Sequence, residues 1–329
     1  MPRPTLSRRR VAALFAAALT TLAAAPSFAQ DGKAAPIRLI VPLSAGSTVD
    51  AIARAMSHQM ARVTGHPIVV ENLAGAGGVT GTVQIVRAPK DGLTLGMVSS
   101  NHVINPSIYK SMPFDALADI TPIGVIGHSP LVLVVSPAAI AARTTKELIA
   151  LLRTQPGRYR YGSAGAGSVL HLAGELFRAE ARVDLKHIPF KGTGPLVADL
   201  SAGMVDMAFV SVMAVAPQVA SGKLRAIAVS TAQRSAVLPE VPTLAESRLP
   251  GYDFDAWLAL VGPPRLSRPL VVQASAELKA VLAQKEVQDA LAAVGFRIAF
   301  GTPGQAEAFF RSERERHAAL ARRAGVVAE

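Results

Sequence analysis

Apolar runs of strand type alternate with segments of helical periodicity along the first third of the chain. Residues 37–41 form a β-branched apolar run, and apolar residues then recur at helical spacing over 51–56. Further strands are predicted at 68–72 and 94–100, with a helix over 75–86 between them. This βαβ rhythm predicts a parallel sheet with helices on both faces.

A second block of the same alternation follows two closely spaced predicted strands, 121–127 and 131–136, where the chain is expected to cross into another lobe. The block is predicted to contain helices at 145–153, 168–177, 195–200 and 214–220, and strands at 159–164, 185–190, 205–210 and 224–230. Beyond it we expect helices near 243–247, over 275–294 and from Thr302, and a strand at 257–261. Thr302 and Gln305 have the spacing of a capping box. The predicted fold is α/β with two lobes, residues 30–126 with 233–329 and residues 127–232.

The first 29 residues have the pattern of an export signal. Arginines at 3 and 8–10 precede an apolar core at 11–25, and small residues at 27–29 predict cleavage after Ala29. This leaves 300 of the 329 residues. The pair at 8–9 keeps twin-arginine export open beside the general route. No later run reaches the roughly 18 apolar residues of a membrane span, so the sequence predicts a periplasmic protein.

Composition excludes several classes of function. The formal charge of +11 falls to +7 without the four signal arginines, and the excess is spread along the chain without a basic run. Nucleic acid is therefore not expected as a partner, whereas a mildly basic field favours small anions. The chain has no cysteine, which excludes disulfides and thiolate-bound metals.

Four predicted strand ends lead into loops of small and hydroxyl-bearing residues, at 44–48, 99–102, 163–168 and 192–194. In open α/β sheets, ligands bind at the carboxyl ends of strands. Unpaired N–H groups and the helix dipole at such a place favour an anion. An ordinary tight turn is the alternative interpretation of any single loop.

Enzyme signatures are not found. The glycine runs do not match a dinucleotide or phosphate loop, Ser163 and Ser168 lack a nucleophile elbow, and the histidines lack metal-ligand spacing. We therefore predict no catalytic residue, metal or cofactor. His171, one turn into a helix, is expected either at the cleft or as an ordinary core or surface histidine. Asp50 is expected to orient a water or to bond the first loop, or else to be an acid stabilised by the helix dipole.

Nine motifs in order resemble those of the Bug-type periplasmic solute-binding proteins of tripartite tricarboxylate transporters. They lie at residues 40–50, 69–78, 91–96, 104–109, 161–168 (with His171), 172–177, 189–194, 221–229 and 238–243. The resemblance covers essentially the whole mature chain. It implies a two-lobed periplasmic binding fold of type II, with a carboxylate held in the cleft between lobes by backbone N–H groups, hydroxyls and bridging waters.

The resemblance also implies the residues of the ligand site. They are Ser44, Ala45, Gly46, Ser47, Thr48 and Asp50 in one clamp, Ser163, Ala164, Gly165, Ser168 and His171 in the other, Ser99, Ser100, Asn101, Gly192 and Thr193 in the walls, and Val210 at a strand end. Relatives often carry an acid at this last position. Valine there predicts a ligand without a free α-amino group, unless it merely packs in the strand.

The function predicted is that of a non-enzymatic, monomeric binding protein. It captures a small organic carboxylate by cleft closure and delivers it to the membrane permease subunits of a tripartite tricarboxylate transporter. One alternative is a periplasmic sensor that reports ligand occupancy to a signalling partner. The other is a hydrolase that uses Ser168 and His171.

Overall fold

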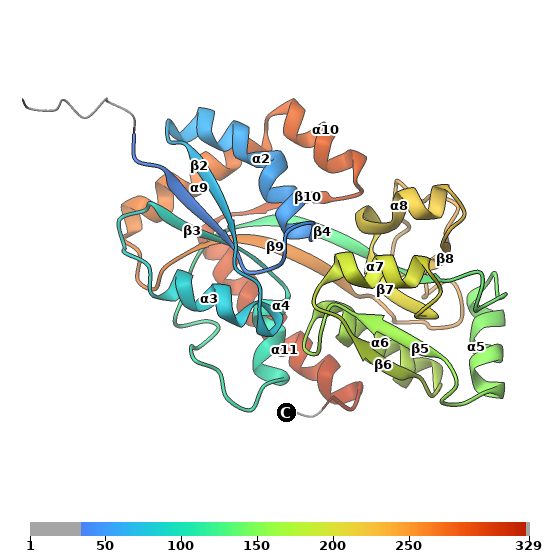
Figure 1. The fold of residues 1–329 in the computed structure, drawn as a ribbon. Coiled ribbons are helices and arrows are strands. Elements are labelled where there is room, and N and C mark those ends of the chain that lie inside the picture. Colours follow the sequence, from blue (N-terminus) through green and yellow to red (C-terminus); the bar gives the residue numbers. More distant parts are fainter. Residues whose placement is uncertain (1–33, 327–329) are drawn as a thin grey trace, which may run out of the picture. The chain divides into compact units, whose positions relative to one another are not determined.

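Two β-sheets that share strand β4 organise the protein (Figure 1). The structure is a computed structural model that describes residues 34–326, so the predicted export signal lies outside it. The first sheet has the order β2-β1-β3-β9-β4, with β10 also on β4; the second contains β8, β4, β7, β5 and β6. The strands are β1 Ile37–Val41, β2 Ile68–Asn72, β3 Thr94–Ser99, β4 Thr121–Val135, β5 Arg160–Ser163, β6 Lys186–Pro189, β7 Met207–Ser211, β8 Arg225–Val229, β9 Asp255–Gly262 and β10 Arg297–Gly301.

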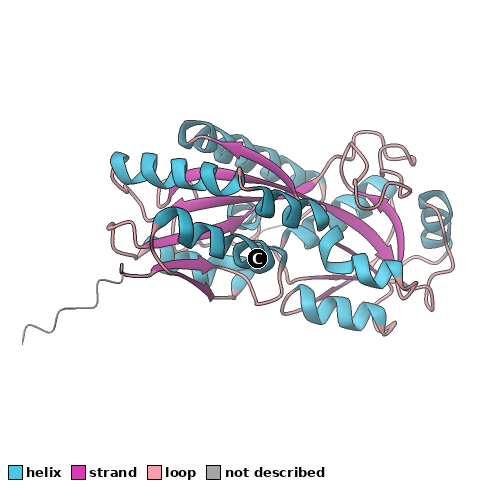
Figure 2. Ribbon diagram, turned by 90° about the horizontal axis from the view of Figure 1, so that it is seen from above, coloured by secondary structure: helices cyan, strands magenta, loops and turns pink. Residues whose placement is uncertain are grey.

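Helices flank both sheets (Figure 2), which confirms the predicted α/β class. The helices are α2 Thr48–Thr64, α3 Val79–Val86, α4 Asn101–Ile104, α5 Thr145–Thr154, α6 Val169–Ala181, α7 Thr193–Ser201, α8 Val212–Ala220, α9 Arg268–Leu282, α10 Lys285–Ala293 and α11 Pro303–Arg323, with short 3-10 turns η1 Ala76–Gly78 and η2 Asn105–Ser107. Within residues 34–326, none of them is long and apolar enough to cross a membrane.

Strand β1 is apolar at every residue except the exposed Arg38. Leu39 and Val41 face a core formed with helices α2, α9 and α10, whereas Ile40 faces a separate cluster formed with α3 and α11. Successive strand residues point to opposite faces. A strand covered by helices on both faces therefore needs a continuous apolar run.

The single long strand β4 replaces the two strands predicted at 121–127 and 131–136. Residues up to Pro130 pair with β9, and residues from Leu131 pair with β7. Proline has no N–H to donate, and it stands where pairing passes from one sheet to the other. The interval between the two predicted strands thus marks the place where β4 passes from the first sheet to the second.

Two other predictions need correction near the end of the chain. The helix expected over 275–294 is broken into α9 and α10 at Ala283 and Gln284. Residues 243–247 form turns, although Thr243 and Glu246 make the reciprocal hydrogen bonds of a capping box. The capping signal is present there without a helix to follow it. The capping box at Thr302 and Gln305, by contrast, is confirmed.

Helix α11 connects the cores of both sheets. Phe310 packs in the cluster under the first sheet and Ala321 packs in the core of the second. Between them, buried Glu313 accepts a hydrogen bond from the Trp257 indole N–H at 2.8 Å. Strand β9 is thereby fixed against the C-terminal helix. The lobe boundaries at residues 126 and 232 stay a prediction.

Acid is expected to destabilise the protein through His102, in α4. Its Nε2 lies 2.7 Å from the Ala116 carbonyl oxygen, and its ring stacks on Phe114. Complete burial lowers the pKa of His102 from 6.5 to about 4. The unfolded chain therefore binds this proton first, so stability is lost as pH falls from 6.5 towards 4.

The expected loss from this residue is about 3 kcal/mol in the free energy of unfolding. Urea unfolding of the parent and of His102→Asn at pH 7.5, 6 and 4.5 measures it. The variant should lose less stability than the parent over this range. Parallel pH profiles would contradict the role given to His102.

Candidate functional site

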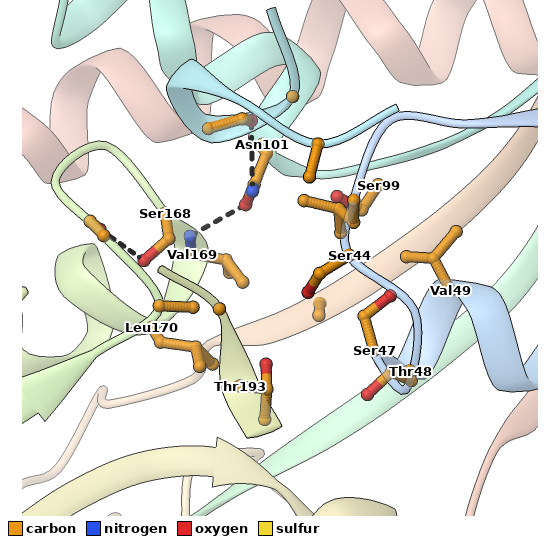
Figure 3. Close-up of a pocket in the computed structure, with 18 of the residues that line it drawn as sticks. Ser44, Ser47, Thr48, Val49, Ser99, Asn101, Ser168, Val169, Leu170 and Thr193 are labelled. Atoms are coloured by element: carbon orange, nitrogen blue, oxygen red, sulfur yellow. Dashed lines mark hydrogen bonds between the residues drawn. The ribbon is translucent and has the colours of Figure 1, made fainter. Parts of the chain in front are cut away.

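Loops from both sheets enclose a cavity of about 520 Å³ (Figure 3). Four helices, α2, α6, α7 and α8, have their N-terminal residues in its wall. The hydroxyl, phenol, amide and ammonium groups of the lining belong to Ser44, Ser47, Thr48, Ser99, Asn101, Tyr109, Ser129, Ser168, Lys191, Thr193 and Ser211. The larger apolar members are Leu43, Val49, Leu131, Val169, Leu170, Phe190 and Leu258.

A charged frame outside the cavity shapes the loop between β1 and α2. The Asp50 carboxylate accepts the Gly46 N–H at 2.9 Å and the Arg54 Nε–H at 2.8 Å. Arg54 also donates to the side chain of Asn72, which in turn donates to the Leu43 carbonyl. Asp50 therefore acts on the loop and not on the cavity, in agreement with one of the roles predicted for it.

The start of α2 presents backbone donors to the cavity. Ser47 caps the helix through its hydroxyl, which accepts the Asp50 N–H at 3.3 Å. Thr48 and Val49 occupy the first two helical positions and line the cavity. Amides at these positions have no partner within a helix. Together with the helix dipole, they favour a negative charge.

The loop before α6 forms a comparable wall on the other side. The Ser168 hydroxyl donates to the Gly165 carbonyl at 2.8 Å and accepts the His171 N–H at 3.2 Å. In Figure 3, Ser168, Val169 and Leu170 lie across the cavity from Ser47, Thr48 and Val49. The Ser168 hydrogen is directed to a carbonyl and not to a base, which argues against the hydrolase that uses Ser168 and His171.

Two stacked histidines support this loop from behind. The rings of His171 and His187 lie 4.2 Å apart, His187 Nε2 lies 2.7 Å from Ser163 Oγ, and His171 Nδ1 accepts the Gly167 N–H. Burial lowers the pKa of His187 to about 4, and His171 adds to the effect. His187 is therefore neutral near pH 7 and serves as part of the scaffold.

The floor of the cavity comes from β4, the strand shared by the two sheets, and from its neighbour β9. Ser129 and Leu131 of β4 and Ala256 and Leu258 of β9 line it. At the same crossing, His128 Nδ1 lies 2.7 Å from Asp255 Oδ2. This floor is mainly apolar, so the polar groups of the site lie mostly in the loops.

The residues that line the cavity include one cationic side chain, Lys191, and no acidic side chain. Among residues 34–326 no cluster of three or more histidines or carboxylates is positioned for a metal ion. An anion in this cavity would therefore be held by neutral hydroxyls and backbone amides. An ammonium group would meet no carboxylate in the wall.

Ten of the predicted site residues line this cavity: Ser44, Ser47, Thr48, Ser99, Asn101, Ala164, Gly165, Ser168, Gly192 and Thr193. Seven lie outside its lining: Ala45, Gly46, Asp50, Ser100, Ser163, His171 and Val210. Most of these seven belong to the loops and their supports. Ser100, for example, is buried and donates its N–H to the Trp257 carbonyl.

Val210 requires a correction because it does not face the cleft. It is fully buried in β7, opposite Val132 of β4, in the core of the second sheet. Alternation along the strand places the next residue, Ser211, in the cavity wall instead. The absence of an acid at position 210 thus has no direct bearing on the ligand.

Sequence reasoning missed several parts of the wall. Ser211 follows a predicted strand and begins a helix, so the rule that identified the other loops applies to it equally. The glycine-rich segment 75–78 was recognised as a helix start and not as a wall. Tyr109 and the floor residues had no local signal, because tertiary packing brings them to the cavity.

The two sides of the cavity meet closely at Gly192 and Ser44. A Cβ atom built on Gly192 would lie 2.6 Å from Ser44 Oγ, and the glycine has φ +136°. Thr48 Oγ1 also lies 2.7 Å from Ser211 Oγ. These contacts show that loops of the two sheets meet directly beside the cavity.

Comparisons with known proteins agree on one family. Residues 52–326 match the family described as "Tripartite tricarboxylate transporter family receptor". BugT of Bordetella pertussis is 35% identical over 304 residues, which cover 92% of this chain and 93% of BugT. The solved structure of the periplasmic binding protein BugD has a TM-score of 0.85 at 29% identity, with 90% of this chain and 99% of that chain covered. The structure of R. palustris Rpa4515 with adipate has a TM-score of 0.87 at 28% identity, with 91% and 100% covered.

Closure of the two loops is expected to depend on the absence of a side chain at Gly192. In Gly192→Ala the added methyl would hold the loops apart, so small-angle X-ray scattering should give a larger radius of gyration. Gly222→Ala is the control, because Gly222 also has positive φ but nothing within 4 Å of its Cβ position. Equal radii for both variants would contradict this prediction.

Proposed function

Because the chain belongs to the tripartite tricarboxylate transporter receptor family, we propose that it captures a small organic carboxylate in this cavity and delivers it to membrane permease subunits. The fold is the two-lobed periplasmic binding protein fold that the sequence predicts. The periplasmic location named for the similar BugD supports a place of action outside the cytoplasm. Residues 1–29 would serve as the export signal, and the binding protein would act as a monomer without catalysis.

The observation that carries the proposal is the convergence of four helix N-termini on a cavity without an acidic side chain. Each helix start contributes unpaired amides and the positive end of a dipole. A carboxylate oxygen accepts such hydrogen bonds, and charge-assisted bonds of this kind are roughly twice as strong as neutral ones. The adipate held by the R. palustris protein makes a dicarboxylate a natural first probe.

The lining also supports a ligand without an ammonium group. A buried ammonium without a carboxylate partner is costly, and the wall offers no acid. This replaces the argument from Val210 with one from the whole lining. We propose that aliphatic dicarboxylates bind in preference to aspartate and glutamate, with the apolar floor covering the carbon chain.

The clamp at α2 is tested by placing a charge on Thr48. In Thr48→Asp the carboxylate would face that of the ligand, and the cost of several kcal/mol corresponds to a loss of affinity of at least about 100-fold. Thr48→Asn has nearly the same shape without the charge and should bind much more tightly than the aspartate variant. Calorimetric titration with adipate, succinate and glutarate measures both.

Unchanged affinity in Thr48→Asp would show that α2 is not the clamp. Failure of the parent to bind any mono-, di- or tricarboxylate in a thermal-shift screen would contradict the proposed function itself. A bound ligand at about 100 times its Kd adds roughly 2.7 kcal/mol of stability, so binding is readily detected.

Lys191 is expected to favour ligands with two negative charges. Its side chain is at the exposed rim of the cavity, where an ion pair is worth about 1 kcal/mol or less and is screened by salt. Lys191→Met should lower the affinity for adipate severalfold at low salt, and it should lower the affinity for hexanoate less.

Lys223→Met is the control, since this exposed lysine belongs to the same lobe but does not line the cavity. Titrations at 20 and 500 mM NaCl separate the charge effect from packing. An equal loss for both ligands at both salt concentrations would contradict the role of Lys191.

A further inference from the structure

Direct hydrogen bonds join the two sides of the closed cavity, and the most deeply buried of them involves Asn101. Its Oδ1 accepts the Val169 N–H at 2.8 Å, as the dashed line in Figure 3 shows. Tyr109 donates its hydroxyl hydrogen to the Ala166 carbonyl at 3.3 Å. Asn101 follows the strand β3 of the first sheet, whereas Val169 follows β5 of the second.

The surroundings of Asn101 determine the orientation of its amide. Its NH₂ group donates to the Gly77 carbonyl at 3.3 Å, and the N–H of Val169 requires an acceptor on the other side. Only the amide oxygen can fill that place. The residue is 5% exposed, so water competes little for either bond.

Asn101 uses a donor that belongs to the anion site. Val169 is the first residue of the 13-residue helix α6, and the His171 N–H is already bonded to the Ser168 hydroxyl. Between them stands Leu170, which lines the cavity. One of the first three amides of α6 thus binds the other lobe, and Leu170, which carries another, lies in the cavity wall.

We infer that Asn101 is a latch that holds the two lobes closed by occupying the first amide of α6 with a neutral oxygen. The inference rests on the proposed function, because it assigns closure of that same site to one side chain. For a ligand that binds only the closed form, the apparent Kd equals the intrinsic Kd divided by the fraction of molecules that are closed. A latch that raises the closed fraction therefore raises affinity in addition to any contact that its side chain makes with the ligand.

The neutral amide suits this position better than a carboxylate would. An aspartate oxygen would also accept the Val169 N–H and would interact more favourably with the helix dipole. Its charge, however, would lie next to the carboxylate of the ligand. Asparagine thus combines closure with tolerance of a bound anion.

The latch is tested by measuring the distance between the two lobes in the parent and in two variants of Asn101. The chain has no cysteine, so Lys90→Cys and Lys146→Cys, at exposed positions beyond the two sheets, accept spin labels without further change. Electron–electron resonance then measures the distance between the lobes with and without 10 mM adipate. In ligand-free Asn101→Ala the distance should shift to longer values, and adipate affinity should fall about three- to tenfold.

Asn101→Asp should keep the distance of the ligand-free parent and lose adipate affinity by about 100-fold. Asn105→Ala is the control, because Asn105 also donates to the Gly77 carbonyl, at 3.2 Å, but is not bonded to α6. It should leave the distance unchanged. An unchanged distance in ligand-free Asn101→Ala, or an equal shift in Asn105→Ala, would overturn the latch. If adipate fails to bind the parent, the proposed ligand is wrong, while the ligand-free distances still decide on the latch.

Discussion

Backbone amides without a partner inside their helix are the constraint on which the site depends. Strands β1, β5 and β7 end at the cavity, and each leads into a helix that starts there, α2, α6 and α8. The first amides of any helix need an acceptor from elsewhere. Ser47 and Ser168 satisfy one such amide each, and Asn101 satisfies another from across the cleft. The helix-start amides that have no such acceptor favour a negative charge in the cavity.

The loops that present these amides are held by polar networks that do not line the cavity. Asp50 and Arg54 fix the first loop, and Ser163 with the two stacked histidines fixes the loop before α6. Binding needs donors at fixed positions, because every donor that must be ordered on binding reduces affinity. Residues without access to the ligand thus contribute to its recognition.

Local signals in the sequence predicted most of the elements and the anion loops. Strands buried on both faces, helix caps and small-residue loops are each recognisable within about ten residues. The failures concern features that depend on distant partners. The continuity of β4 through Pro130 depends on β9 and β7, and the inward direction of Ser211 instead of Val210 depends on the register with Val132. For His171 the sequence left a place at the cleft and an ordinary core or surface position open, because its stacking on His187 of β6 has no local signal.

Reliance on main-chain donors also has a consequence for how this protein can evolve. A point mutation can replace the side chain of Ser44, Leu170 or Phe190, but only a change to proline would remove the backbone N–H of Thr48 or Leu170. Under the proposed function, the capacity to hold a carboxylate would therefore survive most substitutions, whereas the shape around the rest of the ligand could change. New substrates could then arise by change in the apolar wall alone, while the backbone donors to the anion are kept.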